Sequence, residues 1–268
     1  WWVDINGNDM NDGSQSSPFY NLNYAFSQIA NGDTIILTET GQHDINNEIG
    51  GDALSNLTEF HLRGSTGNPK DVSISGNFIS RHFSLQNKIA TFKYITFKNG
   101  FASQASGGGG GGSFIIGPGT ETRVNFDNCI FYRNISDGSG WGYGGAILID
   151  NVQEAKFVNC IFRENNVLNQ GSGGAVYIYD DPSDGQATLH VFDNCQFKRN
   201  GIQYGTINEQ KWSNGGALAI QGAAVIENCV LDSNYIRHEY ANTGETMSAS
   251  GGAIFIGLGG DGNNISSW

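Results

Sequence analysis

The stretch FVNCIFRENN, residues Phe157 to Asn166, decides the fold because the chain states it four times with small changes. The other copies are FDNCIFYRN at Phe126, FDNCQFKRN at Phe192 and IENCVLDSN at Ile226. A second phrase alternates with the first and reads GGAILI at Gly144, GGAVYI at Gly173, GGALAI at Gly215 and GGAIFI at Gly251. Self-similarity at a roughly constant spacing is typical of repeat architectures, in which each copy is one structural unit.

Each repeat is made of short strands rather than helices. The copy that begins at Ala146 contains the runs AILI, AKFVN and CIFRE, which are rich in β-branched and aromatic residues and are bounded by Gly, Asn and Asp. Equivalent cysteines stand 31 to 35 residues apart, and a degenerate earlier copy begins at Thr91. Several short strands per repeat predict an all-β fold, a right-handed parallel β-helix (solenoid) of about seven coils.

One segment near the N-terminus has helical spacing instead. In PFYNLNYAFSQIA, residues 18–30, apolar side chains recur at helical spacing after a Ser-Pro pair that suits a helix start. A short helix there would cover the open end of the solenoid, which otherwise exposes core and strand edges. We therefore divide the chain into an N-terminal cap, residues 1–33, and a β-helix, residues 34–268. The β-helix stops just after a new coil begins, so we expect it to continue in a longer protein.

The repeated Asn-Cys pair is interpreted as structural. Aligning TFKYITF at Thr91 with NFDNCIF at Asn125 places Ile95 beneath Cys129, which indicates that the cysteine position faces the core. We expect free thiols, because a coil spacing of about 4.8 Å is wide for a disulfide, and we expect the asparagines to form an amide ladder at the bend. This ladder comprises Asn128, Cys129, Asn159, Cys160, Asn194, Cys195, Asn228 and Cys229.

The charge of the chain excludes several classes of partner. With 26 acidic and 14 basic residues, the formal net charge is -12, a balance that repels nucleic acid and anionic lipid headgroups. No apolar run approaches the length of a membrane span. The cysteines form no C-x-x-C pair, which argues against a zinc module.

Two motifs resemble those of a known family. The GGA[ILV] phrase and the F-x-x-N phrase, as in Phe162–Asn165, resemble the repeats of chlamydial polymorphic membrane proteins, over residues 91 to 256. That resemblance implies a β-helical adhesin with an extracellular or cell-surface location. The opening VDINGNDMNDGSQSSPFYNLNYAFSQIANGDTIIL resembles the start of secreted pectate-lyase-like β-helix proteins, which include polysaccharide lyases. Many activities occur on this scaffold, so the resemblance is more informative about fold than about function.

A lyase of this fold would need a basic residue on the exterior of one parallel sheet. In the GGA strands the apolar set that includes Ile147 and Ile149 is taken as inward. The outward set contains no Arg, Lys or His, which argues against proton abstraction there; it comprises Leu148, Asp150, Tyr177, Tyr179, Ala219, Gln221, Phe255 and Gly257. Other basic residues recur once per coil and are interpreted as a solvated rim, as with Arg133, Arg163, Lys198 and Arg199.

Acidic residues near one turn form a candidate calcium site. Carboxylate oxygens are the ligands that calcium prefers, and the candidate ligands are Asp150, Asp180, Asp181 and Asp184. The alternative is an ordinary polar turn, because the segment YDDPSDG also contains Pro and Gly.

Aromatic residues gather in the insertions between the F-x-x-N and GGA phrases and on the neighbouring sheet. Because these insertions leave the same corner of successive coils, we expect their aromatic side chains to cluster on one side. Aromatic faces flanked by amides suit stacking on sugar rings or contact with a protein; the alternative is that the loops bury each other's aromatic residues. The candidate ligand-binding residues are Trp141, Tyr143, Tyr177, Tyr179, Tyr204, Trp212, Tyr235, Tyr240 and Phe255.

Three interpretations follow, in order of preference. The first is a surface-displayed binding or adhesion module that recognises a glycan or a cell-surface protein through its lateral loops. The second is a calcium-dependent polysaccharide lyase of the pectate type. The third is a structural component of a surface layer or filament, in which coils would self-associate end to end.

Overall fold

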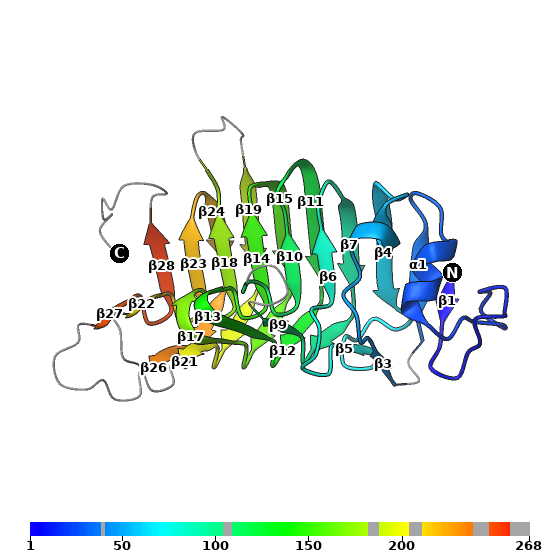
Figure 1. The fold of residues 1–268 in the computed structure, drawn as a ribbon, viewed down its shortest axis with the longest axis horizontal. Coiled ribbons are helices and arrows are strands. Elements are labelled where there is room, and N and C mark those ends of the chain that lie inside the picture. The colour runs from blue at the N-terminus through cyan, green and yellow to red at the C-terminus, as the bar shows by residue number, and fades with distance from the viewer. Residues whose placement is uncertain (39–40, 104–108, 182–187, 204–210, 238–246, 258–268) are drawn as a thin grey trace.

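The computed structural model describes residues 1–38, 41–103, 109–181, 188–203, 211–237 and 247–257. Over these residues the chain is a parallel β-solenoid of about seven coils, elongated along the stacking direction (Figure 1). From β7 (Ile89–Lys93) onward the coils pass through four parallel sheets, named here sheets I to IV in chain order. The all-β class and the stacked coils that the repeats predict are therefore confirmed.

Sheets I and II form two sides of the coil and meet at the Asn-Cys bend. Within the described residues, sheet I contains β1 (Trp2–Val3), β2 (Thr34–Leu37), β4 (Glu59–Gly64), β7 (Ile89–Lys93), β11 (Gly119–Asp127), β15 (Val152–Val158), β19 (Leu189–Asp193) and β24 (Ala224–Glu227). Sheet II contains β3 (Gln42–Asp44), β5 (Ser73–Ser75), β8 (Thr96–Lys98), β12 (Ile130–Tyr132), β16 (Ile161–Arg163), β20 (Gln196–Lys198) and β25 (Val230–Asp232).

Sheets III and IV complete the coil. Over the same residues, sheet III contains β9 (Phe101–Ser103), β13 (Ile135–Tyr143), β17 (Asn166–Ser172), β21 (Gly201–Gln203), β22 (Lys211–Asn214), β26 (Tyr235–Arg237) and β27 (Met247–Ser250). Sheet IV, whose arrows stand along the middle of Figure 1, contains β6 (Phe83–Leu85), β10 (Phe114–Ile116), β14 (Ile147–Asp150), β18 (Val176–Tyr179), β23 (Leu218–Gln221) and β28 (Ile254–Gly257).

The N-terminal end of the stack is covered by a helix, as predicted, but a shorter one. Helix α1 spans Leu22–Gln28, because the side chain of Asn21 caps it by accepting a hydrogen bond from the backbone N–H of Asn23. Its Phe26 ring packs on Phe60, with ring centroids 5.2 Å apart. A 3-10 turn, η1 (Gly51–Leu54), follows. None of the described helices is long and apolar enough to cross a bilayer.

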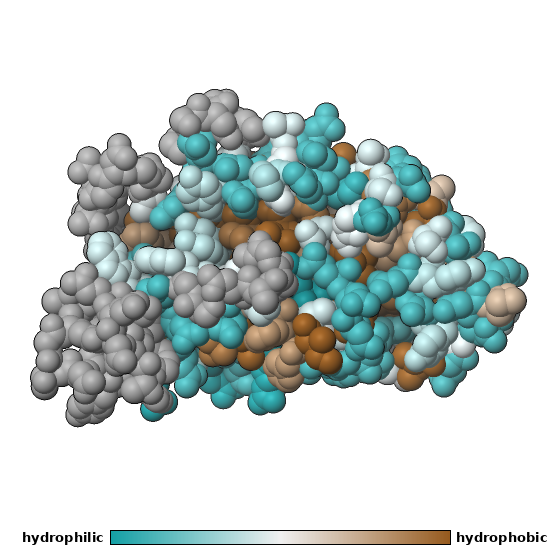
Figure 2. Space-filling view, in the orientation of Figure 1, coloured by the Kyte–Doolittle hydropathy of each residue, from teal (hydrophilic) through white to brown (hydrophobic). Residues whose placement is uncertain are grey.

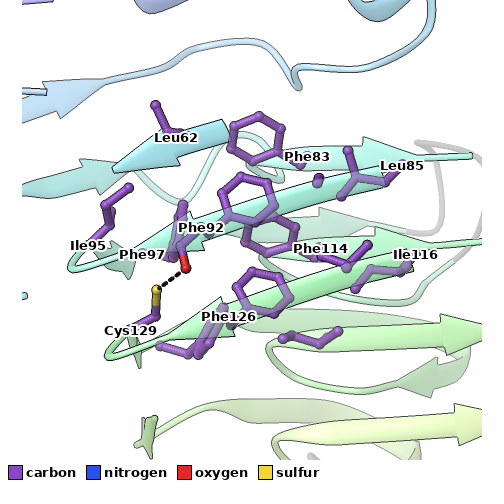
Figure 3. Close-up of a cluster of buried hydrophobic side chains, with 14 of the residues drawn as sticks. Leu62, Phe83, Leu85, Phe92, Ile95, Phe97, Phe114, Ile116, Phe126 and Cys129 are labelled. Atoms are coloured by element: carbon purple, nitrogen blue, oxygen red, sulfur yellow. Dashed lines mark hydrogen bonds between the residues drawn. The ribbon is translucent and has the colours of Figure 1, made fainter. Parts of the chain in front are cut away.

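Two columns of phenylalanine rings fill the core. In sheet I, Phe126 stacks on Phe157 at 5.1 Å and Phe157 on Phe192 at 4.7 Å between ring centroids. In sheet II, Phe131 and Phe162 stack at 4.8 Å. Figure 3 shows Phe92 and Phe126 of the sheet I column, with Phe83 and Phe114 of sheet IV packed against them. Identical residues stack because the parallel strands pair in register, so every repeat places its rings at the same site.

The cysteines form an inward-facing row beside these columns. Cys129, Cys160 and Cys195 are fully buried and Cys229 is partly exposed; all four thiols are free. Each Sγ lies 3.4 or 3.5 Å from a phenylalanine carbonyl oxygen of the preceding coil, as Figure 3 shows for Cys129 and Phe92. Ile95 is buried at the equivalent place, in agreement with the alignment.

The asparagines before the cysteines have a different role from the amide ladder that the sequence predicts. They occupy the left-handed region with φ between 53° and 56°, at Asn128, Asn159, Asn194 and Asn228. Asn194 Nδ2 donates to Asn159 Oδ1 at 2.7 Å, but Asn128 and Asn228 donate to aspartates instead. Asparagine tolerates this conformation better than most residues. The row therefore fixes the backbone bend and is not a continuous ladder.

A continuous amide ladder lies six residues further on. Asn134, Asn165 and Asn200 are fully buried, and each donates from Nδ2 to the Oδ1 of the next asparagine, ending at Asn234, over 2.9 to 3.0 Å. Each Nδ2 also donates to a phenylalanine carbonyl of the previous coil, as Asn165 does to Phe131 at 3.0 Å. These asparagines are the last residues of the F-x-x-N motif.

Candidate functional site

Five side chains line an open pocket on the exterior of sheet IV. They are Tyr143 at the end of β13, Leu148 and Asp150 on β14, and Tyr177 and Tyr179 on β18, around a volume of about 280 Å³. We call this the tyrosine pocket. Figure 2 shows a band of apolar residues along this face, over the strands of sheet IV and between hydrophilic borders.

The alternation of each strand brings these residues together. In β14, Ile147 and Ile149 are buried in the core, whereas Leu148 and Asp150 point outward and are partly exposed. The register pairs Leu148 with Tyr177 and Asp150 with Tyr179. The inward and outward sets assigned from the sequence are thus confirmed for these strands.

Tyrosine stacking gives the pocket its rigid wall. The rings of Tyr143 and Tyr177 stack with centroids 4.7 Å apart and planes 26° apart. The Tyr177 hydroxyl donates to Gln221 Oε1 at 2.9 Å. Burial, followed by the nearby Tyr143, Tyr179 and Asp150, raises the pKa of Tyr177 well above its usual value, so this hydroxyl stays protonated near neutral pH. Two of the predicted aromatic residues therefore form a fixed, uncharged surface.

Among the described residues, Asp150 supplies the one carboxylate that lines the pocket. Partial burial and, second, the negative charge of Asp180 raise the pKa of Asp150. Its Oδ1 accepts a hydrogen bond from Asn151 Nδ2 at 3.3 Å. A partly exposed carboxylate next to aromatic rings is suited to accept hydrogen bonds from hydroxyl groups.

The other predicted calcium ligands have different surroundings. Asp180 is buried and accepts hydrogen bonds from Thr188 Oγ1 at 3.1 Å, and its Oδ2 lies 3.1 Å from His190 Nε2. Asp181 is partly exposed, and Asp184 lies outside the described residues. Among the residues that the structure describes, no group of three or more His, Cys, Asp or Glu side chains is placed to hold a metal ion. The calcium site therefore stays a prediction.

The remaining predicted aromatic residues do not join this pocket. Trp141 and Trp212 are exposed on sheet III, Phe255 is half-buried on β28, and Tyr235 lines a separate groove. Tyr204 and Tyr240 lie outside the described residues. The expected cluster is therefore observed for Tyr143, Tyr177 and Tyr179.

A second hollow escaped the sequence reasoning. Arg133, which we had interpreted as part of a solvated rim, lines a groove of about 630 Å³ together with Glu164, Arg199 and Tyr235. The signal was present in the repeats: Arg133, Glu164 and Arg199 occupy the same position of successive F-x-x-N phrases. Opposite charges at one repeat position predict that side chains of neighbouring coils form ion pairs there.

Comparisons with known proteins find similar solved structures. No family model and no curated protein matches the chain, so neither supports the resemblance to chlamydial repeats. A rhamnogalacturonan lyase has 16% identity and a TM-score of 0.43 over 94% of this chain, which spans 62% of the length of that lyase. The pectin methylesterase from Aspergillus niger has 12% identity and a TM-score of 0.39, over 99% of this chain and 90% of its own. Escherichia coli ybhc has 10% identity and a TM-score of 0.37, over 96% and 84%. At these values the likeness carries no argument about what this chain binds or does.

Proposed function

We propose that the chain is a glycan-binding β-helix that holds an uncharged sugar ring in the tyrosine pocket. The observation that carries this proposal is the rigid stack of Tyr143 on Tyr177, which lines one open pocket with Tyr179 and Asp150. A working location outside the cell belongs to the same proposal, with the resemblance to surface adhesin repeats as its support.

The chemistry of the pocket favours sugar over other ligands. Tyrosine faces stack on the apolar C–H face of a sugar ring and require little ordering, because the rings are already packed. The carboxylate of Asp150 accepts hydrogen bonds from hydroxyl groups and repels an anionic ligand. Among the described residues the lining holds no arginine, lysine or histidine to act as the base of a lyase, so we favour binding without turnover.

Calorimetric titration of the chain with uncharged tetrasaccharides of glucose, mannose, galactose and xylose tests the proposal. At least one sugar is expected to bind, and Tyr179→Ala is expected to weaken that binding about tenfold through loss of one aromatic face. Tyr179 is the variant of choice because it is more exposed than Tyr177, so its removal disturbs the core less.

Tyr20→Ala is the matched control, since Tyr20 is 55% exposed in the N-terminal cap, far along the chain from the pocket. Its binding should equal that of the unmodified chain. Equal binding by Tyr179→Ala, or no binding of any sugar by the unmodified chain, contradicts the proposal. Calcium-dependent release of unsaturated products from a polyuronate, followed by ultraviolet absorbance, would replace it with the lyase interpretation.

A further inference from the structure

The second hollow lies at another corner of the coil, between sheets II and III. Its lining includes Phe78, Arg133, Glu164, Asn166, Arg199 and Tyr235, around a volume of about 630 Å³. We call it the arginine groove. It shares no lining residue with the tyrosine pocket, and its residues come from coils spread along most of the stack.

Backbone geometry aims the charged side chains out of this corner. Arg133, Glu164 and Arg199 have φ of 53°, 57° and 54°, so all three adopt the left-handed conformation at the same bend. The next residue in each coil is a buried asparagine of the amide ladder. Because the ladder locks the bend from inside, the side chains before it project outward at fixed, coil-to-coil intervals.

The corner carries more positive than negative charge. Arg133 Nε lies 3.1 Å from Glu164 Oε2, and Arg199 Nη2 lies 3.0 Å from Glu164 Oε1. Arg163 lies 3.8 Å from the same carboxylate and 4.3 Å above the Tyr132 ring. Three guanidinium groups therefore surround one carboxylate, in a chain whose formal net charge is -12. Glu164 holds Arg133 and Arg199 in place from one side, and both remain more than half exposed on the other.

An aromatic platform lies beside these arginines. The Tyr235 ring lies against Gly201, where an added Cβ atom would come within 2.5 Å of the ring atoms. The Tyr235 hydroxyl reaches across that coil and donates to Asn166 Oδ1 at 2.7 Å. Glycine at 201 is what leaves space for the ring, since Ile135 and Asn166 occupy the equivalent places in earlier coils. The side chain is thereby held at its backbone and at its hydroxyl, and it lines the groove.

We propose that the arginine groove binds an anionic saccharide, with its carboxylate or sulfate groups on Arg133 and Arg199 and a sugar ring on Tyr235. Guanidinium groups bind carboxylates and sulfates through paired hydrogen bonds. A fixed aromatic face adds a stacking surface for the ring that carries those groups. An acidic peptide would use the arginines but would lack the apolar C–H face with which a sugar ring stacks on tyrosine.

The groove and the tyrosine pocket select opposite ligands. Asp150 disfavours anions in the pocket, whereas the arginines favour them in the groove. The second site therefore does not rest on the first, and either proposal can fail alone. A glycan that carries both neutral and charged residues would contact both sites of one chain.

Calorimetric titration at low salt with three probes tests the groove. The probes are tetragalacturonate, which carries carboxylates, a heparin tetrasaccharide, which also carries sulfates, and uncharged maltotetraose. At least one charged probe should bind, and Arg133→Gln and Arg199→Gln should each weaken its binding about tenfold while leaving any binding of maltotetraose unchanged. Tyr235→Ala should weaken the same probe, and Tyr235→Phe, which keeps the ring, should weaken it less.

Arg123→Gln, on sheet I, is the matched control because it removes the same charge outside the groove. Its affinity should stay within about twofold of that of the unmodified chain. The proposal is overturned if neither charged probe binds, if Arg123→Gln weakens binding as much as Arg133→Gln, or if hexaglutamate binds as tightly as the charged saccharides. Circular dichroism of each variant separates lost binding from lost structure. Loss of neutral-sugar binding in Tyr179→Ala concerns the other site and leaves this result unaffected.

Discussion

Two rows of asparagine run the length of the repeats, six residues apart, and they do opposite things. The row of Asn159 sits at an outward bend, where the residue is chosen for its backbone conformation. The row of Asn165 points inward, where the side chain makes the contacts between coils. Asparagine thus contributes a favourable backbone conformation in the outward row and buried hydrogen bonds in the inward row.

The largest expected loss of stability is that of Asn165→Ala. Asn165 Oδ1 accepts from the backbone N–H and from the side chain of Asn134, and its Nδ2 donates to Phe131 and Asn200. Removing the amide leaves several buried groups without partners, so we expect a loss of about 3 to 5 kcal/mol in the free energy of unfolding. Urea unfolding followed by circular dichroism measures it. A loss no greater than that of Asn159→Ala would show that the two rows are equivalent.

A histidine extends the inward row toward the N-terminus. Gly100 stands where the preceding coil would place an asparagine, and its N–H donates to Asn134 Oδ1 at 2.8 Å. His82 lies beside it, with Nε2 3.2 Å from the carbonyl oxygens of Ile74 and Lys98. Since carbonyls only accept, Nε2 carries the proton of the neutral ring, and Nδ1 accepts from Ser113 Oγ at 2.8 Å.

This histidine makes the inward row sensitive to acid. Burial lowers the pKa of His82 from 6.5 to about 4. The unfolded chain therefore takes up a proton at higher pH than the folded chain, and the stability that is full above pH 6.5 is lost as the pH falls toward 4. The expected loss is about 3 kcal/mol, from the linkage between the two pKa values.

Urea unfolding of the chain and of His82→Gln at a series of pH values from 7.5 to 4 checks this expectation, because the variant should lose less stability than the parent over that range. His61→Gln is the control, since it removes a partly exposed histidine on β4, outside the buried row. An identical pH dependence in His82→Gln would assign the acid sensitivity to other groups, such as the buried His43.

A smaller effect is expected at the cysteine that follows the outward row. Cys160 is fully buried, and burial raises the pKa of its thiol. Cys160→Ser places a more polar and smaller group among phenylalanine rings, so we expect a loss of about 1 to 2 kcal/mol in unfolding free energy. Denaturant unfolding measures this loss. Titration of the native chain with a thiol reagent complements it: Cys229, which is partly exposed, should react first, and the buried cysteines only after unfolding.

The smallest effect belongs to the outward asparagine itself. Asn159→Gly keeps a residue that adopts positive φ freely, so the free energy of unfolding should change little. Asn159→Ala should cost about 1 kcal/mol, because alanine is disfavoured in the left-handed region. Thermal unfolding of the two variants side by side resolves this difference. An equal loss in the two variants would mean that the hydrogen bond from Asn194, which both of them remove, dominates at this site.

The sequence sufficed for the fold because every repeat carries the same inward residues. Phe157 and Phe162 recur at matching places, and identical residues in parallel, in-register strands have to stack. The outward set of sheet IV followed from simple alternation, and so did the neighbourhood of Tyr177 and Tyr179. The inward or outward direction of a side chain within a strand could therefore be inferred from the sequence alone.

The asparagine rows and the arginine groove needed the structure because they depend on the bends between strands. Asn159 is itself left-handed and Asn165 follows the left-handed Glu164, and only coordinates show which of the two asparagine side chains enters the core. Asp180 likewise turns inward to His190, although it follows the outward Tyr179 in a polar segment. The position of the Tyr235 ring depends on Gly201 in the neighbouring coil. A contact between different residues of two repeats does not follow from the pattern of a single repeat.

The phenylalanine columns also govern how the molecule comes apart. Each ring touches rings of the coils beside it, so the favourable energy resides in the interfaces between neighbours rather than in any coil by itself. Such a chain behaves as a one-dimensional cooperative lattice, in which opening starts where a coil has a neighbour on one side only. Amide hydrogens of β12 and β16, in the middle of the stack, are therefore expected to exchange last with deuterated solvent, and protection should decline coil by coil toward either end.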